Sequence, residues 1–321
     1  MRRLFLALLI VLCGAPLFAR ASAQDLDARA RADGAAQLAR MLEASGGLAA
    51  WRAQGGAAWD VLDTLRVQPE PDGGEWRVHH RVARRAVFDP AGQGWLHSEY
   101  ARYDEPSARV VVDPFRQVSS GDAAWAEHGG RADRAAPTAA RARDAVRREF
   151  LLGALPFALA ELGAEVRALE PGALGDRRVE RVAVHLPSPV VMEDSEAVAD
   201  FELLLDPETA RPLRLAYTLV GADRDDPERG PTQAWIDFSG RLEVGKVFLP
   251  ARRELFHAGG TRRLAGELAR ASAGAPAPAG LRRPWISGLV WSGAERATSW
   301  DPPARGAPRR SALESAPSGG R

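Results

Sequence analysis

Six histidines are the first side chains to test for chemistry in this chain of 321 residues. A zinc or copper site needs ligands at a spacing that brings them together, as in His-Glu-x-x-His or paired cysteines, and neither pattern occurs. His79 and His80 are adjacent, so in a strand they point to opposite faces and cannot ligate one ion. We expect His80 to be a core histidine. The others are expected on wet strand faces or loops: His79, His97, His128, His185 and His257.

Acidic residues crowd one loop, at Asp223, Asp225, Asp226 and Glu228. Clustered oxygens suit Ca²⁺, but the loop lacks the glycine and the spacing of a calcium-binding hand, so a solvated hairpin loop is favoured over a cation site. The chain also lacks a Gly-x-Ser-x-Gly elbow, a phosphate-binding glycine loop and a recognisable carboxylate pair. The sequence therefore predicts no catalytic residues, no metal and no cofactor. A divergent secreted hydrolase, with a site assembled from distant residues, is kept as an alternative.

Large apolar side chains carry more information, because the chain has nine tryptophans. Each indole can bury about 200 Å² of surface, so these residues either fill a core or line an apolar pocket. The apolar stretch 150–159 follows arginines at 141, 143, 147 and 148. It is a lid over a cavity, an interfacial element that meets acyl chains with the arginines near phosphates, or a helix that plugs the open side of the sheet, and the last is favoured. The candidates for lining a cavity are Trp51, Trp59, Trp76, Trp95, Trp125, Phe150, Leu152 and Phe157.

The elements that would position these residues follow from hydrophobic periodicity. A helix is expected over 34–44, capped by Asp33 and ended by Gly46-Gly47, with a short helical turn to Trp51. Period-two alternation predicts strands over 76–88, 182–186, 201–205, 213–219, 233–238 and 244–256, with a turn at Asp206 to Thr209. A helical insertion is expected over 139–169, broken near Pro156. The pattern predicts an α+β fold, an antiparallel sheet covered on one face.

Several pieces of the chain together resemble a known family. They are the helix with Gly46-Gly47 and Trp51, the strand around Asp60 to Val67, Gly121 to Trp125, Leu155-Pro156-Phe157, Phe201 to Asp206 with Pro207-Glu208-Thr209, and Val244-Gly245 with Leu249-Pro250. These pieces resemble an uncharacterised family of secreted bacterial proteins related to the periplasmic lipoprotein-carrier fold (outer-membrane lipoprotein-sorting, LolA-like). The resemblance implies a curled antiparallel half-barrel wrapped around helices, with an apolar cavity that in the carriers binds acyl chains.

The first residues predict export. Arg2 and Arg3 precede the apolar run Leu4 to Leu12, and Ala21-Ser22-Ala23 precedes Gln24, which is typical of a signal peptide over 1–23. We expect the mature protein in the periplasm or the medium. Lipid attachment at Cys13 is the disfavoured alternative, because Leu12 is a poor residue before such a cysteine. Cys13 is the only cysteine, so the mature chain would form no disulfide.

The mature chain would be nearly neutral, since loss of Arg2, Arg3 and Arg20 takes the net charge from +1 to −2. A nearly neutral chain has no global positive field to hold nucleic acid, so no nucleic-acid partner is expected. After residue 23 the sequence contains no apolar run of about 18 residues, so no transmembrane helix is expected in the mature chain.

We expect one domain over 24–300, with a loop at 271–280 and a disordered tail over 301–321. The leading hypothesis is a non-enzymatic exported protein that binds a lipid or acyl chain. The alternative of another class is an envelope structural or protein-interaction module without a cavity.

Overall fold

A computed structural model describes residues 25–67, 77–102, 115–129, 131–192, 196–219, 231–257 and 262–269. Several sequence predictions lie outside these residues and stay predictions: the signal peptide 1–23 with Cys13, the acidic loop 223–228, the loop 271–280 and the tail 301–321. Among the described residues, no helix is both long and apolar enough to cross a membrane.

The N-terminal helix occupies residues 25–44 and is longer than expected. Asp33 lies inside this helix, so its prediction as the N-cap is wrong; the alanines and arginines upstream favour helix, and Arg31 pairs with Asp27 one turn earlier. The predicted end is confirmed. Gly46 and Gly47 take φ angles of 103° and 89°, and the Gly47 N–H donates to the Leu42 carbonyl at 2.8 Å. Helix α2 (Leu48–Ala53) follows and buries Trp51.

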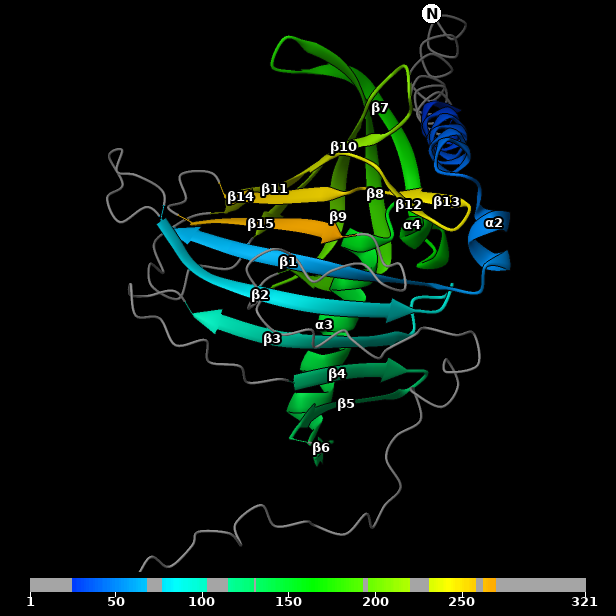
Figure 1. The fold of residues 1–321 in the computed structure, drawn as a ribbon. Coiled ribbons are helices and arrows are strands. Elements are labelled where there is room, and N and C mark those ends of the chain that lie inside the picture. The colour runs from blue at the N-terminus through cyan, green and yellow to red at the C-terminus, as the bar shows by residue number, and fades with distance from the viewer. Residues whose placement is uncertain are drawn as a thin grey trace, which may run out of the picture.

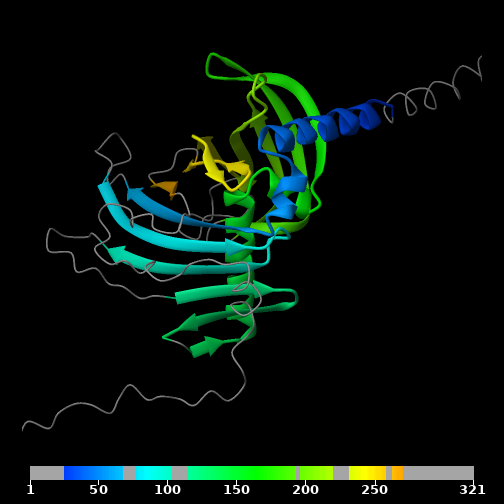
Figure 2. The ribbon, with the colours of Figure 1, turned by 45° about the vertical axis from the view of Figure 1, so that its right-hand side comes forward.

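Thirteen strands form one antiparallel sheet in the order β6-β5-β4-β3-β2-β1-β15-β14-β11-β10-β9-β8-β7, which curls without closing (Figures 1 and 2). β15 joins the two halves, because it pairs with both β1 and β14. The strands are β1 (Ala57–Val67), β2 (Arg77–Phe88), β3 (Gly94–Arg102), β4 (Phe115–Ser120), β5 (Ala123–His128), β6 (Arg131–Asp133), β7 (Glu165–Leu174), β8 (Arg177–Met192), β9 (Glu196–Leu205), β10 (Pro212–Leu219), β11 (Thr232–Ser239), β14 (Arg252–His257) and β15 (Arg262–Ala269).

Two predicted elements differ from those observed. The helical insertion breaks at Pro156 as expected, into α3 (Ala136–Gly153) and α4 (Phe157–Glu161), but it does not reach residue 169. Gly163, with φ of 70°, ends it, and β7 begins at Glu165. The expected strand 244–256 is interrupted as well. A small hairpin of β12 (Leu242–Val244) and β13 (Val247–Leu249) turns at Gly245, and β14 then pairs with β11.

Helix α3 lies in the concavity of the sheet. It contacts β3, β4 and β5 in one limb and β8 in the other, so the sheet curls around it (Figure 1). One large apolar cluster fills the space between the helices and the concave face. A second, smaller cluster lies on the opposite face of β1–β5. The expected α+β half-barrel around helices is confirmed.

Candidate functional site

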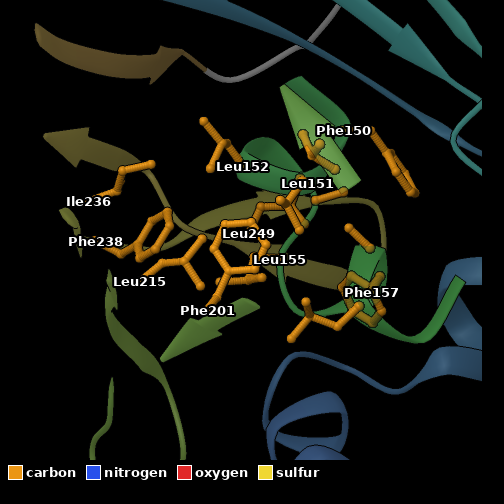
Figure 3. Close-up of a cluster of buried hydrophobic side chains, with 14 of the residues drawn as sticks. Phe150, Leu151, Leu152, Leu155, Phe157, Phe201, Leu215, Ile236, Phe238 and Leu249 are labelled. Atoms are coloured by element: carbon orange, nitrogen blue, oxygen red, sulfur yellow. The ribbon is translucent and has the colours of Figure 1, made fainter. Parts of the chain in front are cut away.

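The concave face holds an apolar plug, which we define as residues 146–159 of α3, α4 and the turn between them. Phe150, Leu151, Leu155 and Phe157 have no exposed surface. Figure 3 shows that the plug side chains converge with side chains of the opposite limb of the sheet. The sheet residues labelled there are Phe201, Leu215, Ile236 and Phe238; Leu249 of the small hairpin lies beside them, and all five belong to the same cluster.

The sequence of α3 explains why this helix enters the sheet. Ala142, Val146 and Phe150 follow one another at intervals of four residues and form a buried stripe. Arginines on the other side attach the helix to the sheet rim. Arg143 donates to the Asp122 carbonyl at 2.9 Å, and Arg147 donates to the Ser188 carbonyl at 2.8 Å. These arginines therefore connect both limbs of the half-barrel to α3.

Aromatic rings link the plug to the first strands. The Trp51 ring stacks on Phe157 with centroids 5.0 Å apart, and its indole N–H donates to the Pro90 carbonyl at 3.0 Å. Trp59 stacks on Phe88 at 5.0 Å, and Phe88 meets Phe150 at 5.3 Å. Five of the eight cavity-lining candidates thus lie in one cluster: Trp51, Trp59, Phe150, Leu152 and Phe157.

The other candidates do not join that group. Successive residues of a strand face opposite sides, and Ala58 lies on the face away from the plug while Trp59 lies towards it. Trp95 and Trp125 are on the same side as Ala58, in the smaller cluster. Trp76 lies outside the described residues. Alternation marks which residues share a face within one strand, but it does not say which face is concave.

A buried ionic network, which the sequence analysis missed, holds the plug to the sheet. Glu149 of α3 is 4% exposed and accepts the Trp59 indole N–H at 3.0 Å. Arg253 of β14 donates to both Glu149 oxygens, at 3.1 and 2.7 Å, and reaches Asp63 of β1 at 3.5 Å. Arg84 of β2 pairs with the other oxygen of Asp63. The network joins α3 to the consecutive strands β1 and β2 and to β14, which lies far from them in the sequence.

Electrostatics explains why this network is tolerated in the interior. Burial alone lowers the pKa of Arg253, but attraction by Glu149 and Asp63 outweighs it, so the pKa is raised above its ordinary value. Arg148 beside the network has a lowered pKa, because burial and the nearby Arg84 both oppose its charge. One signal in the sequence could have found the network: Asp63 occupies an inward position of β1 two residues beyond Val61, where an apolar residue would be expected.

The described histidines are dispersed. His128 stacks on Phe115 at 5.6 Å, and the His185 ring nitrogen lies 2.7 Å from Asp200 on the exposed surface. His97 lies on the convex face, where burial and then Arg116 lower its pKa. Within the described ranges, no three His, Cys, Asp or Glu side chains gather as a metal site requires. The arrangement is suited to apolar packing, and its buried charges are paired with one another.

No family model matches the sequence, and no curated protein matches it. Among solved structures, a domain named for outer-membrane lipoprotein sorting from Vibrio parahaemolyticus is 12% identical, covers 71% of this chain and 91% of its own, and has a TM-score of 0.39. A DUF1329 family protein from Desulfovibrio piger is 12% identical, with coverage of 74% and 95% and a TM-score of 0.41. LprF from Mycobacterium bovis is 13% identical, with coverage of 77% and 99% and a TM-score of 0.27.

Proposed function

We propose that this protein is an exported, non-enzymatic carrier that binds a lipid or acyl chain in the half-barrel by displacing the plug. One observation carries the proposal. The concave face of an unclosed sheet is filled largely from a single insertion between β6 and β7, and this insertion is helical. A segment of this kind can leave the concavity without breaking any strand pairing.

The energetics of exchange are balanced. An acyl chain of sixteen carbons gains about 12 kcal/mol when fully buried, at about 0.8 kcal/mol per methylene group. The plug contributes two phenylalanines and four leucines, and each buried side chain of this type is worth about 1.5–3 kcal/mol. Because the two gains are similar, a ligand chain can replace the plug, and the concave surface stays covered in both states.

A variant that weakens the plug tests this exchange. Phe157→Ala removes the ring that stacks on Trp51 and is expected to cost about 3–5 kcal/mol of packing. Because the ligand must displace the plug, the variant should bind a fluorescent long-chain fatty acid at least about tenfold more tightly than the natural chain. Val118→Ala, on the opposite face, is the control and should leave the affinity unchanged.

Co-purifying molecules provide the second measurement. The mature chain should carry lipid that organic extraction releases and mass spectrometry identifies. The proposal would be refuted if no lipid co-purified and if neither the natural chain nor Phe157→Ala took up the fluorescent fatty acid.

A second candidate function is an envelope module that binds a protein and holds no ligand. It is favoured by the dense packing of the concavity, where Trp51, Trp59 and the plug phenylalanines have no exposed surface. Under this alternative Phe157→Ala only lowers stability, and crosslinking in the envelope recovers a protein partner.

A further inference from the structure

The convex face of the first five strands carries a continuous apolar row, which we call the convex ladder. Strand register aligns its members directly: Ala58 pairs with Val87, Val87 with Trp95, Trp95 with Val118, and Val118 with Trp125. A polar row runs beside it, composed of Asp60, Arg85, His97, Arg116 and Glu127.

The convex ladder is buried, although it lies on the side away from the helices. Its five residues expose at most 5% of their surface. Arg116 lies over the Trp95 ring at 4.5 Å and Arg134 over the Trp125 ring at 5.8 Å, so each covers part of one indole. The described helices contribute to the large cluster on the concave side, whereas the smaller cluster contains only strand residues. Two arginines alone do not cover a row of five apolar residues.

The position where the chain leaves β15 indicates what covers it. Ala269, the last residue of β15, pairs with Asp60 of β1. Because the two strands are antiparallel, β15 runs in the direction from Asp60 towards Ala58, the first member of the convex ladder. β15 therefore ends beside the convex ladder. The segment 103–114 begins after Arg102 and ends before Phe115. Both residues lie on the side of the polar row that is away from the convex ladder, so this segment is less well placed to cover the ladder.

The length and composition of the chain after Ala269 also suit it to cover the convex ladder. The ladder crosses four strand spacings, about 19 Å, and the eleven residues 270–280 can span about 36 Å when extended. The next eleven residues, Leu281 to Trp291, include two tryptophans and four aliphatic residues: Leu281, Trp285, Ile286, Leu289, Val290 and Trp291. This is the most apolar part of the chain after β15.

We propose that residues 281–291 dock on the convex ladder and complete the fold by covering Trp95, Val118 and Trp125. The half-barrel is then closed on both faces by its own chain, with the plug on the concave face and the C-terminal segment on the convex face. This inference is independent of the proposed ligand.

Thiol labelling tests the docking directly, because residues 24–321 contain no natural cysteine. Val118→Cys places a thiol between Trp95 and Trp125 of the ladder, at a position with no exposed surface. Its labelling rate is measured in the chain 24–321, in a chain ending at residue 300 and in a chain ending at residue 280. Ala142→Cys, buried on the concave side of α3, reports on the fold as a whole.

We expect the thiol of Val118→Cys to react at least about tenfold faster in the chain ending at 280 and equally slowly in the other two, while Ala142→Cys stays protected in all three. The double substitution Trp285→Ser/Trp291→Ser in the full chain should reproduce the faster labelling. An unchanged rate after truncation at 280 would overturn the proposal. So would equal acceleration at both cysteines, or protection that depends on protein concentration, which would show that a second copy is the cover.

Discussion

Replacing Glu149 by leucine tests whether the buried network fixes the plug to the sheet. Glu149 accepts two hydrogen bonds from Arg253 and one from Trp59. The substitution removes the carboxylate and leaves Arg253, which is 7% exposed, with Asp63 as its remaining described acid at 3.5 Å. A buried cation is thereby left with a weaker partner, and the indole N–H loses its acceptor.

The magnitude follows from these contacts. Removing one partner of a buried ion pair costs about 3–5 kcal/mol, because the remaining charge stays desolvated. Glu149→Leu is therefore expected to lower the free energy of unfolding by that amount. The double variant Glu149→Leu/Arg253→Met removes both charges and should recover a large part of the loss, while the Trp59 indole N–H left without its acceptor still costs about 1–3 kcal/mol.

Urea unfolding followed by circular dichroism measures both effects. Glu202→Leu is the matched control, because Glu202 binds Arg181 at 2.7 Å on a solvent-facing part of the sheet; its loss should be about 1 kcal/mol or less. Two results would refute the reasoning: a Glu149→Leu loss as small as that of the control, or a double variant as unstable as the sum of the two single ones.

Three further changes have defined outcomes. Gly34→Val should lower the free energy of unfolding in urea by about 1–3 kcal/mol, because a Cβ at Gly34 would lie 2.6 Å from the Val166 carbonyl oxygen, where the N-terminal helix crosses β7. Ala35→Val, on the exposed side of the helix, is the control and should leave this free energy unchanged. His97→Gln should flatten the fall in stability below about pH 6.5, because a folded-state pKa lowered by burial makes the unfolded state bind more protons as the pH drops; equal slopes in the natural chain and His97→Gln would contradict the assignment. Asp206→Ala should lose about 1–2 kcal/mol, because its carboxylate accepts the N–H groups of Glu208 and Thr209 at 2.9 Å, whereas Glu208→Ala should change little.

Local patterns predicted the parts of the fold that depend on neighbouring residues. Gly46 and Gly47 ended a helix, Pro156 broke another, and Asp206 began a turn, because each acts through its own backbone or side chain. Alternation correctly indicated β8 to β11. Other strands were missed, and β15 is an example: it has weak alternation, Arg-Arg-Leu-Ala-Gly-Glu-Leu-Ala, and is fixed by pairing with β1 and β14 on both sides.

The candidate site was less accessible from sequence, because its geometry depends on long-range pairing. Glu149, Arg253 and Asp63 lie in three distant segments, and only the folded sheet brings them together. The tryptophans illustrate the same limit. Trp59 and Trp95 both occupy strands of the first limb, yet the direction of sheet curvature places one beside the plug and the other on the convex ladder.

The most direct test of the proposed carrier function is amide hydrogen exchange of residues 146–159, with and without saturating long-chain fatty acid. Exchange in β1 and β2 serves as the internal reference, because these strands stay paired in either state. The account predicts that the fatty acid binds and that exchange of the plug amides becomes faster while the strands are unchanged. Binding that leaves the plug amides unchanged, or no binding at all, would contradict it.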